Sequence, residues 1–232
     1  NDKRIPPKVV KSIADDLDKR RSQLGFDSSS PHTGAQFGFR IVDGRPEVAS
    51  ETRESVGRTY NRTVSNGATV EGLVIDPDEI VFETAEYGRW DLFFERFRSV
   101  SGYALKSALS VTDATHLIVE YVDRFIFDGA PEKADPSLIL LGLEGALHEE
   151  ALSGKSLWHL HRGWFEDLNG HPLLINQNLD AQMGQRPDQS SVRSVQIYTK
   201  AEYAVGSRSL DENAINADLE ALHKRNNQVF SS

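Results

Sequence analysis

The alternation of hydrophobic and polar residues is clearest over residues 115–127, where it predicts a β-strand. Successive side chains of a strand point to opposite faces, so positions two apart share a face. Apart from position 123, one face of this strand carries the apolar side chains Leu117, Val119, Tyr121, Phe125 and Phe127. Further strands are predicted over residues 157–165, 172–179 and 192–205.

Apolar residues at helical spacing predict three helices. The first lies between Pro7, which suits a first helical turn, and Gly25, a natural stop. The longest covers residues 90–108, where one face is apolar over about five turns. The last begins after Ser209, which has capping-box spacing to Glu212, and continues as an apolar stripe toward the end of the chain.

The segments between these elements are predicted to be turns, loops and short strands. Residues 27–34 are rich in Ser, Pro and Gly, which predicts a loop. Residues 36–84 read as short strands, and residues 73–82 among them as a hairpin that turns at Pro77. Residues 137–152 fit either a helix or an irregular apolar segment.

The order of elements favours the α+β class. Strands occur in clusters rather than alternating with helices, which is typical of antiparallel sheets with helices packed on them. We expect the long central helix and the C-terminal helix to cover the sheet or sheets of a single α+β domain, residues 1–232. Two related halves, residues 1–110 and 111–232, are an alternative organisation, although no residue-level repeat is visible.

The composition of the chain excludes several kinds of chemistry and partner. The 232 residues include no cysteine, which excludes disulfides, thiolate nucleophiles and iron–sulfur clusters. The net charge of −9 argues against a general nucleic-acid binder, which needs a basic surplus. No apolar run approaches the roughly 20 residues that span a bilayer, so no membrane partner is expected. The N-terminal residues also lack the apolar core of a signal peptide, and the expected location is therefore cytoplasmic.

The chain has a Pro6-Pro7 pair near its start and, after it, three stretches with recognisable motifs, namely residues 80–97, 117–125 and 222–230. In these stretches the chain resembles a sporadically distributed, uncharacterised family of bacterial proteins of similar length. The family has no agreed activity, so the resemblance carries over no catalytic residue. Its patchy distribution is typical of defence or toxin–antitoxin genes, and the resemblance implies a role of that kind.

Asp123 is the most informative single residue, because it interrupts the apolar face of the strand over residues 115–127. A carboxylate on such a face loses hydration and needs donors or a proton. It could be an acid poised for proton transfer or ligand binding, together with Tyr121 and Arg124. The alternative is a structural hydrogen-bonding residue, which the resemblance favours because the family often has Asn there.

His159 and His161 are two residues apart in a predicted strand and so share a face, as metal ligands must. Asp167 and His171 follow closely enough to complete a metal site. The alternative is that both histidines simply face solvent or a partner. A third histidine, His223, is expected to stabilise the last helix or to face solvent.

Three functions are compatible with these patterns, and no cofactor can be named for any of them. The first is a protein-binding accessory or regulatory protein, since no catalytic set is assembled and the many aromatic residues could anchor an interface. The second is a metal-dependent hydrolase or nuclease of unfamiliar type that uses His159 and His161. The third is a small-ligand or nucleotide sensor with a pocket between sheet and long helix.

Overall fold

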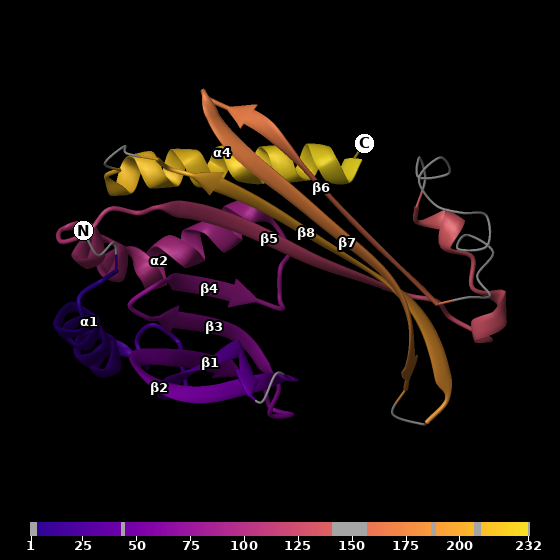
Figure 1. Cartoon of the computed structure of the whole chain (residues 1–232), viewed down its shortest axis with the longest axis horizontal. Coiled ribbons are helices and arrows are strands. Elements are labelled where there is room, and N and C mark those ends of the chain that lie inside the picture. Colours follow the sequence, from indigo (N-terminus) through magenta and orange to yellow (C-terminus); the bar gives the residue numbers. More distant parts are fainter. Residues whose placement is uncertain (1–3, 43–44, 141–156, 187–188, 207–209, 232) are drawn as a thin grey trace. The chain divides into compact units, whose positions relative to one another are not determined.

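The structure of the protein, a computed structural model, describes residues 4–42, 45–140, 157–186, 189–206 and 210–231, with the backbone alone within residues 33–55, at 137 and at 229–231 (Figure 1). It confirms the α+β class, since the described residues form two antiparallel sheets of four strands each and three α-helices. The chain divides into two compact units. One comprises Asn1–Ala114 with Ser209–Asn213, and the other Thr115–Arg208 with Ala214–Ser232.

The first unit is a meander of strands between two helices. Its elements are α1 (Pro7–Arg20), β1 (Ser28–Val42), β2 (Arg45–Thr63), β3 (Thr69–Ile75), β4 (Ile80–Thr84) and α2 (Trp90–Leu109). The strands are hydrogen-bonded in the order β1-β2-β3-β4, so every strand pairs with its neighbour in sequence. Helix α1 contacts β2 and helix α2 contacts β4.

The prediction of a loop over residues 27–34 is wrong, because β1 begins at Ser28. Ser28 pairs with Asn61 in β2, and this backbone ladder outweighs the turn preference of Ser and Pro residues. Pro31 is tolerated because β1 lies at the edge of the sheet, and the register shifts directly after it. Strands β1 and β2 have 15 and 19 residues, so they are not the short strands expected.

The predicted hairpin is confirmed as β3 and β4. Leu73 pairs with Phe82 and Ile75 with Ile80, which places the turn at residues 76–79. The Asp76 carboxylate accepts a hydrogen bond from the backbone N–H of Asp78 at 3.2 Å, as expected of an Asx turn.

Helix α1 provides much of the core of this unit. Its buried face packs with residues of β2, β3 and α2 in one cluster, whose members include Val10, Ile13, Leu17, Phe26, Tyr60, Leu73, Ile75, Val100 and Ala104. The Tyr60 hydroxyl is buried but donates a hydrogen bond to the carbonyl oxygen of Ala14 at 3.0 Å. This bond satisfies the polar end of a side chain that is otherwise enclosed.

The second unit combines a sheet with the C-terminal helix. Its elements are β5 (His116–Ile126), the 3₁₀ turns η1 (Pro131–Lys133) and η2 (Pro136–Leu138), β6 (Trp158–Leu168), β7 (His171–Gln185), β8 (Ser191–Ala204) and α4 (Glu212–Ser231). The strand order is β5-β8-β7-β6, so the first strand of the unit pairs with the last. The four strands predicted here are confirmed, whereas the unassigned segment 137–152 is described only as far as residue 140.

One face of the second sheet is more deeply buried than the other. Along β7, for example, residues 173, 175, 177, 179 and 181 are buried and their neighbours are not. Helix α4 lies on the buried face, where the Asn226 side chain donates a hydrogen bond to the carbonyl oxygen of Val119 at 3.3 Å. The helix begins at Glu212, which the capping box would place inside its first turn, and Ser209 lies outside the described residues.

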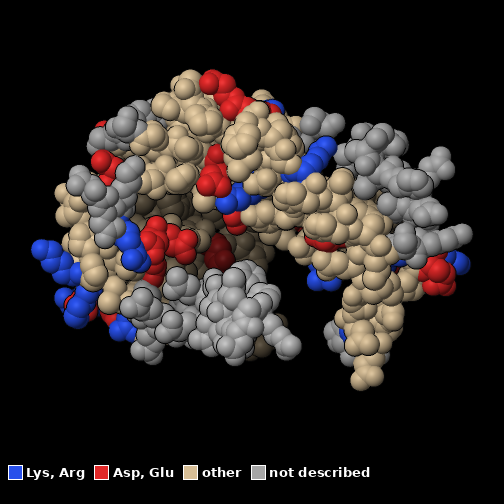
Figure 2. All heavy atoms as spheres, viewed as in Figure 1, with Lys and Arg blue, Asp and Glu red and all other residues tan. Residues whose placement is uncertain are grey.

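The face of the molecule drawn in Figure 2 does not separate the two signs of charge. On the face drawn in Figure 2, acidic and basic side chains are interspersed among uncharged ones. None of the described helices is both long and apolar enough to cross a membrane.

Candidate functional site

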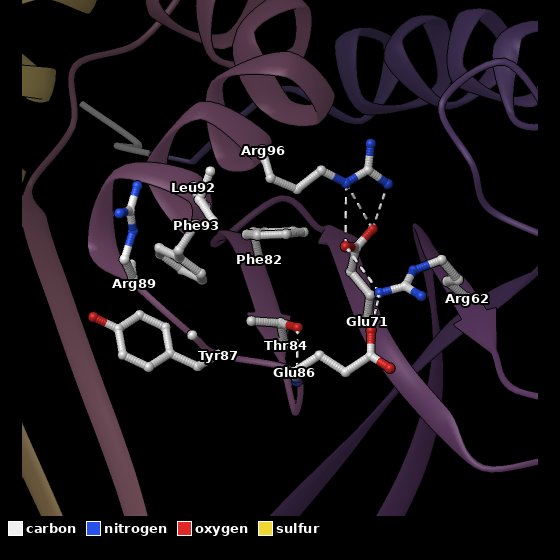
Figure 3. A pocket seen from close by; sticks show the side chains of 11 residues that line it. Arg62, Glu71, Phe82, Thr84, Glu86, Tyr87, Arg89, Leu92, Phe93 and Arg96 are labelled. Atoms are coloured by element: carbon white, nitrogen blue, oxygen red, sulfur yellow. Dashed lines mark hydrogen bonds and ion pairs between the residues drawn. The ribbon is translucent and has the colours of Figure 1, made fainter.

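A hollow opens in the first unit between the edge of its sheet and the start of α2 (Figure 3). Its volume is about 190 Å³. Strands β2, β3 and β4, the β4–α2 connection and the first turns of α2 line it through Arg62, Glu71, Phe82, Thr84, Glu86, Tyr87, Gly88, Arg89, Leu92, Phe93 and Arg96.

The β4–α2 connection shapes one side of this hollow. The Thr84 hydroxyl donates to the carbonyl oxygen of Val70 at 3.1 Å and accepts from the backbone N–H of Glu86 at 3.1 Å. These two bonds fix the chain where β4 ends. Arg89 is then extended, with φ −149°, and α2 begins at the next residue. The connection therefore holds Tyr87 and Arg89 beside the first turn of the helix.

Aromatic rings form a wall of the hollow. Phe93 lies at the centre of this wall, with ring centroids 5.3 Å from Phe82 and 6.0 Å from Tyr87. Two side chains at its rim are unusually exposed for their size, Tyr87 at 43% and Leu92 at 57%. The hollow therefore presents apolar surface to solvent instead of enclosing it.

Paired charges form the opposite wall. Glu71 is only 5% exposed and accepts hydrogen bonds from Arg96, with 3.0 Å between Arg96 Nε and Glu71 Oε1. Arg62 lies 3.6 Å from Glu71 and donates to Glu86 at 2.8 Å, and this bond to Glu86 raises the pKa of Arg62. The two arginines and two glutamates thus neutralise one another.

The lining combines aromatic and apolar side chains with paired charges, which suits it to holding a small, partly apolar group. Sites for drug-sized ligands typically measure about 300–1,000 Å³, and this hollow of about 190 Å³ is smaller. Its volume matches one inserted side chain or a comparably small group.

In the second unit, Tyr121 meets His223 at the buried face of the sheet. The Tyr121 hydroxyl lies 2.6 Å from His223 Nδ1, and Asn227 Nδ2 lies 3.1 Å from His223 Nε2. Burial lowers the pKa of His223, which favours the neutral ring. In that neutral ring, Nε2 accepts from the Asn227 amide nitrogen, which can only donate, and Nδ1 donates to Tyr121. Of the two alternatives expected for His223, the one in which it faces solvent is wrong, since this residue is 9% exposed.

Asp123 shares the inner face of β5 with Tyr121 and is half-buried. Desolvation raises the pKa of its carboxyl group, as predicted for an acid on an apolar face. Within the described part of the chain, the carboxylate has no hydrogen-bond or ion-pair partner. Arg124 points to the other face and donates to the Ser194 hydroxyl at 3.2 Å. The structure therefore brings Asp123 and Tyr121 to one face and separates Arg124 from them.

A row of polar side chains crosses the same inner face and was missed by the sequence analysis. Tyr121, Thr199, Gln177 and Arg162 lie opposite one another on β5, β8, β7 and β6. Arg162 donates to Gln177 at 2.7 Å, and Gln177 donates to Thr199 at 3.4 Å. Their alternation within each strand was visible, but the register that aligns them across the sheet was not.

His159 and His161 lie on the exposed outer face of β6. Each contacts the residue directly opposite on β7, namely Asp180 and Asn178 respectively. Asp167 lies instead near the end of β6, where its carboxylate accepts from the backbone N–H of Gly170, in the β6–β7 turn, at 2.9 Å. Among the described residues, no group of three or more His, Asp or Glu side chains could hold a metal ion.

The hollow was also missed as a site, because its parts are far apart in sequence. Tyr87 and Arg89 were visible only as part of a short aromatic motif. Nothing in the sequence signals that Arg62, Glu71 and Arg96 meet.

Comparison of the chain with protein-family models, with curated proteins and with solved structures gives no match. The resemblance to sporadically distributed bacterial proteins stays a prediction.

Proposed function

We propose that this protein is an accessory or regulatory subunit that acts by binding another protein, and that the hollow of the first unit receives an anchor side chain of that partner. The observation that carries the proposal is the combination of a volume of about 190 Å³ with an exposed aromatic rim. Interface hot spots are typically Trp, Tyr and Arg residues around a pocket that one partner side chain fills.

The charges at the rim indicate the chemistry of the partner segment. Arg89 and Asp91 form an ion pair whose side chains are 69% and 63% exposed, so the pair contributes little and is readily exchanged. A partner carboxylate could take the place of Asp91 on Arg89. We therefore expect an apolar or aromatic anchor side chain flanked by an acidic residue.

Site-specific photo-crosslinking tests this proposal in the native host. A photo-reactive amino acid replaces Leu92 at the rim, and the matched control carries it at Val111, an exposed apolar residue of the same unit. We expect one discrete crosslinked protein from position 92, its loss when Tyr87→Ala is added, and none from position 111. Equal crosslinking from both positions, or indifference to Tyr87→Ala, would contradict the proposal.

A small-ligand sensor is the second candidate, because the hollow lies between the sheet and the long helix as that hypothesis requires. A small molecule that raises the melting temperature of the wild type but not of Tyr87→Ala would favour the sensor over the docking function.

A further inference from the structure

The outer face of β6 carries a feature that the proposed docking function does not use. His159 and His161 are two residues apart on this strand, so their side chains project from the same face. Both are exposed, and the side chain of His159 is 57% accessible to solvent. The pair is therefore open to a solute from solution.

The contacts of both rings fix which nitrogen carries the proton. His159 Nδ1 lies 2.5 Å from Asp180 Oδ1, and an ionised carboxylate can only accept, so Nδ1 is the donor. His161 Nδ1 makes the corresponding contact with the carbonyl oxygen of the Asn178 side chain. In the neutral rings, the lone pair is left on Nε2 of each histidine.

Two neighbouring histidines with this hydrogen-bonding pattern resemble metal ligands and their supporting shell. Ligating histidines almost always donate their second ring N–H to a carboxylate or carbonyl oxygen, which fixes the tautomer and makes the free nitrogen more basic. Here both histidines have such a partner, provided by directly opposite residues of the same hairpin.

We propose that His159 and His161 chelate a divalent transition-metal ion of the zinc class through their Nε2 atoms. Imidazole nitrogen suits Zn²⁺, Ni²⁺ and Cu²⁺, whereas Mg²⁺ and Ca²⁺ prefer oxygen ligands. Catalytic zinc sites typically have three protein ligands. The described residues supply two such ligands, and water is expected to complete the coordination of the ion.

Calorimetric titration of the full chain without an affinity tag, with Zn²⁺ as the probe, tests the site. We expect one Zn²⁺ per chain, no binding of Mg²⁺, and loss of Zn²⁺ binding in a His159→Gln, His161→Gln double variant. A matched double variant, His116→Gln with His171→Gln, removes two other histidines and is expected to bind Zn²⁺ like the wild type. Retention of binding by the first double variant, or no binding by the wild type, overturns the proposal.

Asp180 provides a second test that distinguishes ligand positioning from a general loss of structure. Asp180→Ala removes the acceptor of His159 and is expected to weaken Zn²⁺ binding about tenfold or more, because loss of such partners typically costs 10–100-fold in affinity. Asp180→Asn keeps an acceptor oxygen and is expected to restore most of that loss. Equal affinities of both variants and the wild type would show that Asp180 does not position the ring, and would remove this support for the site.

Discussion

Replacement of Arg96 by Met is expected to destabilise the first unit strongly. The substitution leaves the carboxylate of Glu71, which is 5% exposed, with Arg62 as its cation at 3.6 Å. Breaking a buried ion pair from one side typically costs about 3–5 kcal/mol. Arg96 also donates to the carbonyl oxygen of Leu24 at 2.6 Å and lies over the ring of Phe26. Since the Arg96 side chain is itself 30% exposed, we expect about 3 kcal/mol.

Urea unfolding followed by circular dichroism measures this loss. With an m-value of about 2 kcal/mol per molar urea, a loss of about 3 kcal/mol lowers the midpoint by about 1.5 M. The matched control is Arg89→Met, which breaks the exposed pair with Asp91 and is expected to cost less than about 0.5 kcal/mol. A double variant, Arg96→Met with Glu71→Leu, is expected to lose less than Arg96→Met alone, because no carboxylate is left buried.

Equal midpoints for Arg96→Met and Arg89→Met would refute this reasoning. They would mean that removing the arginine partner of the buried Glu71 costs no more stability than removing the arginine partner of the exposed Asp91.

Four further perturbations test the second unit. Asp123→Asn is expected to raise the midpoint of urea unfolding at pH 7. Folding raises the pKa of the Asp123 carboxyl above 3.8, so ionisation of this group opposes folding. The stability of the wild type therefore falls as the pH rises above 3.8. His223 has the opposite sign of pH dependence, since its pKa is lowered from 6.5 and the unfolded state binds the extra proton. Unfolding titrations are therefore expected to show stability lost as pH falls below about 6.5, a loss that His223→Gln removes. Tyr121→Phe takes away the acceptor of His223 Nδ1 and is expected to cost about 1–3 kcal/mol in the same assay. Leu173→Ala empties a fully buried position of β7 and is expected to cost about 2–5 kcal/mol, and a smaller loss would contradict the observed packing.

Elements with strong local signals were predictable from the sequence. The strand over residues 115–127, the helix over residues 90–108 and the hairpin at Pro77 each combine periodicity with end or turn residues, and all three are present. Strand β1 could not be predicted over residues 28–34, because its local composition favours a turn. Only pairing with β2, in which Ser28 lies opposite Asn61 and Gly34 opposite Arg53, makes it a strand.

The candidate sites likewise contain features that the sequence predicts and features that it does not. The position of Asp123 on an apolar face followed from alternation alone, and so did the shared face of His159 and His161. The hydrogen-bond partner of Tyr121 did not follow from alternation, because His223 lies in helix α4, far from Tyr121 in the sequence. The polar residues of α4 face inward here since they find partners on the sheet, which helical periodicity cannot reveal.

The different strand orders of the two sheets have a consequence for how the chain folds. Every pair in the first sheet joins consecutive strands, so each hairpin can close as soon as its second strand has been synthesised. In the second sheet, β5 is made first but its neighbour is β8, with Ile126 opposite Ser194. Closing that long loop costs entropy before any contact is gained, which slows folding. Refolding is therefore expected to show two phases, with the slower phase belonging to the second unit.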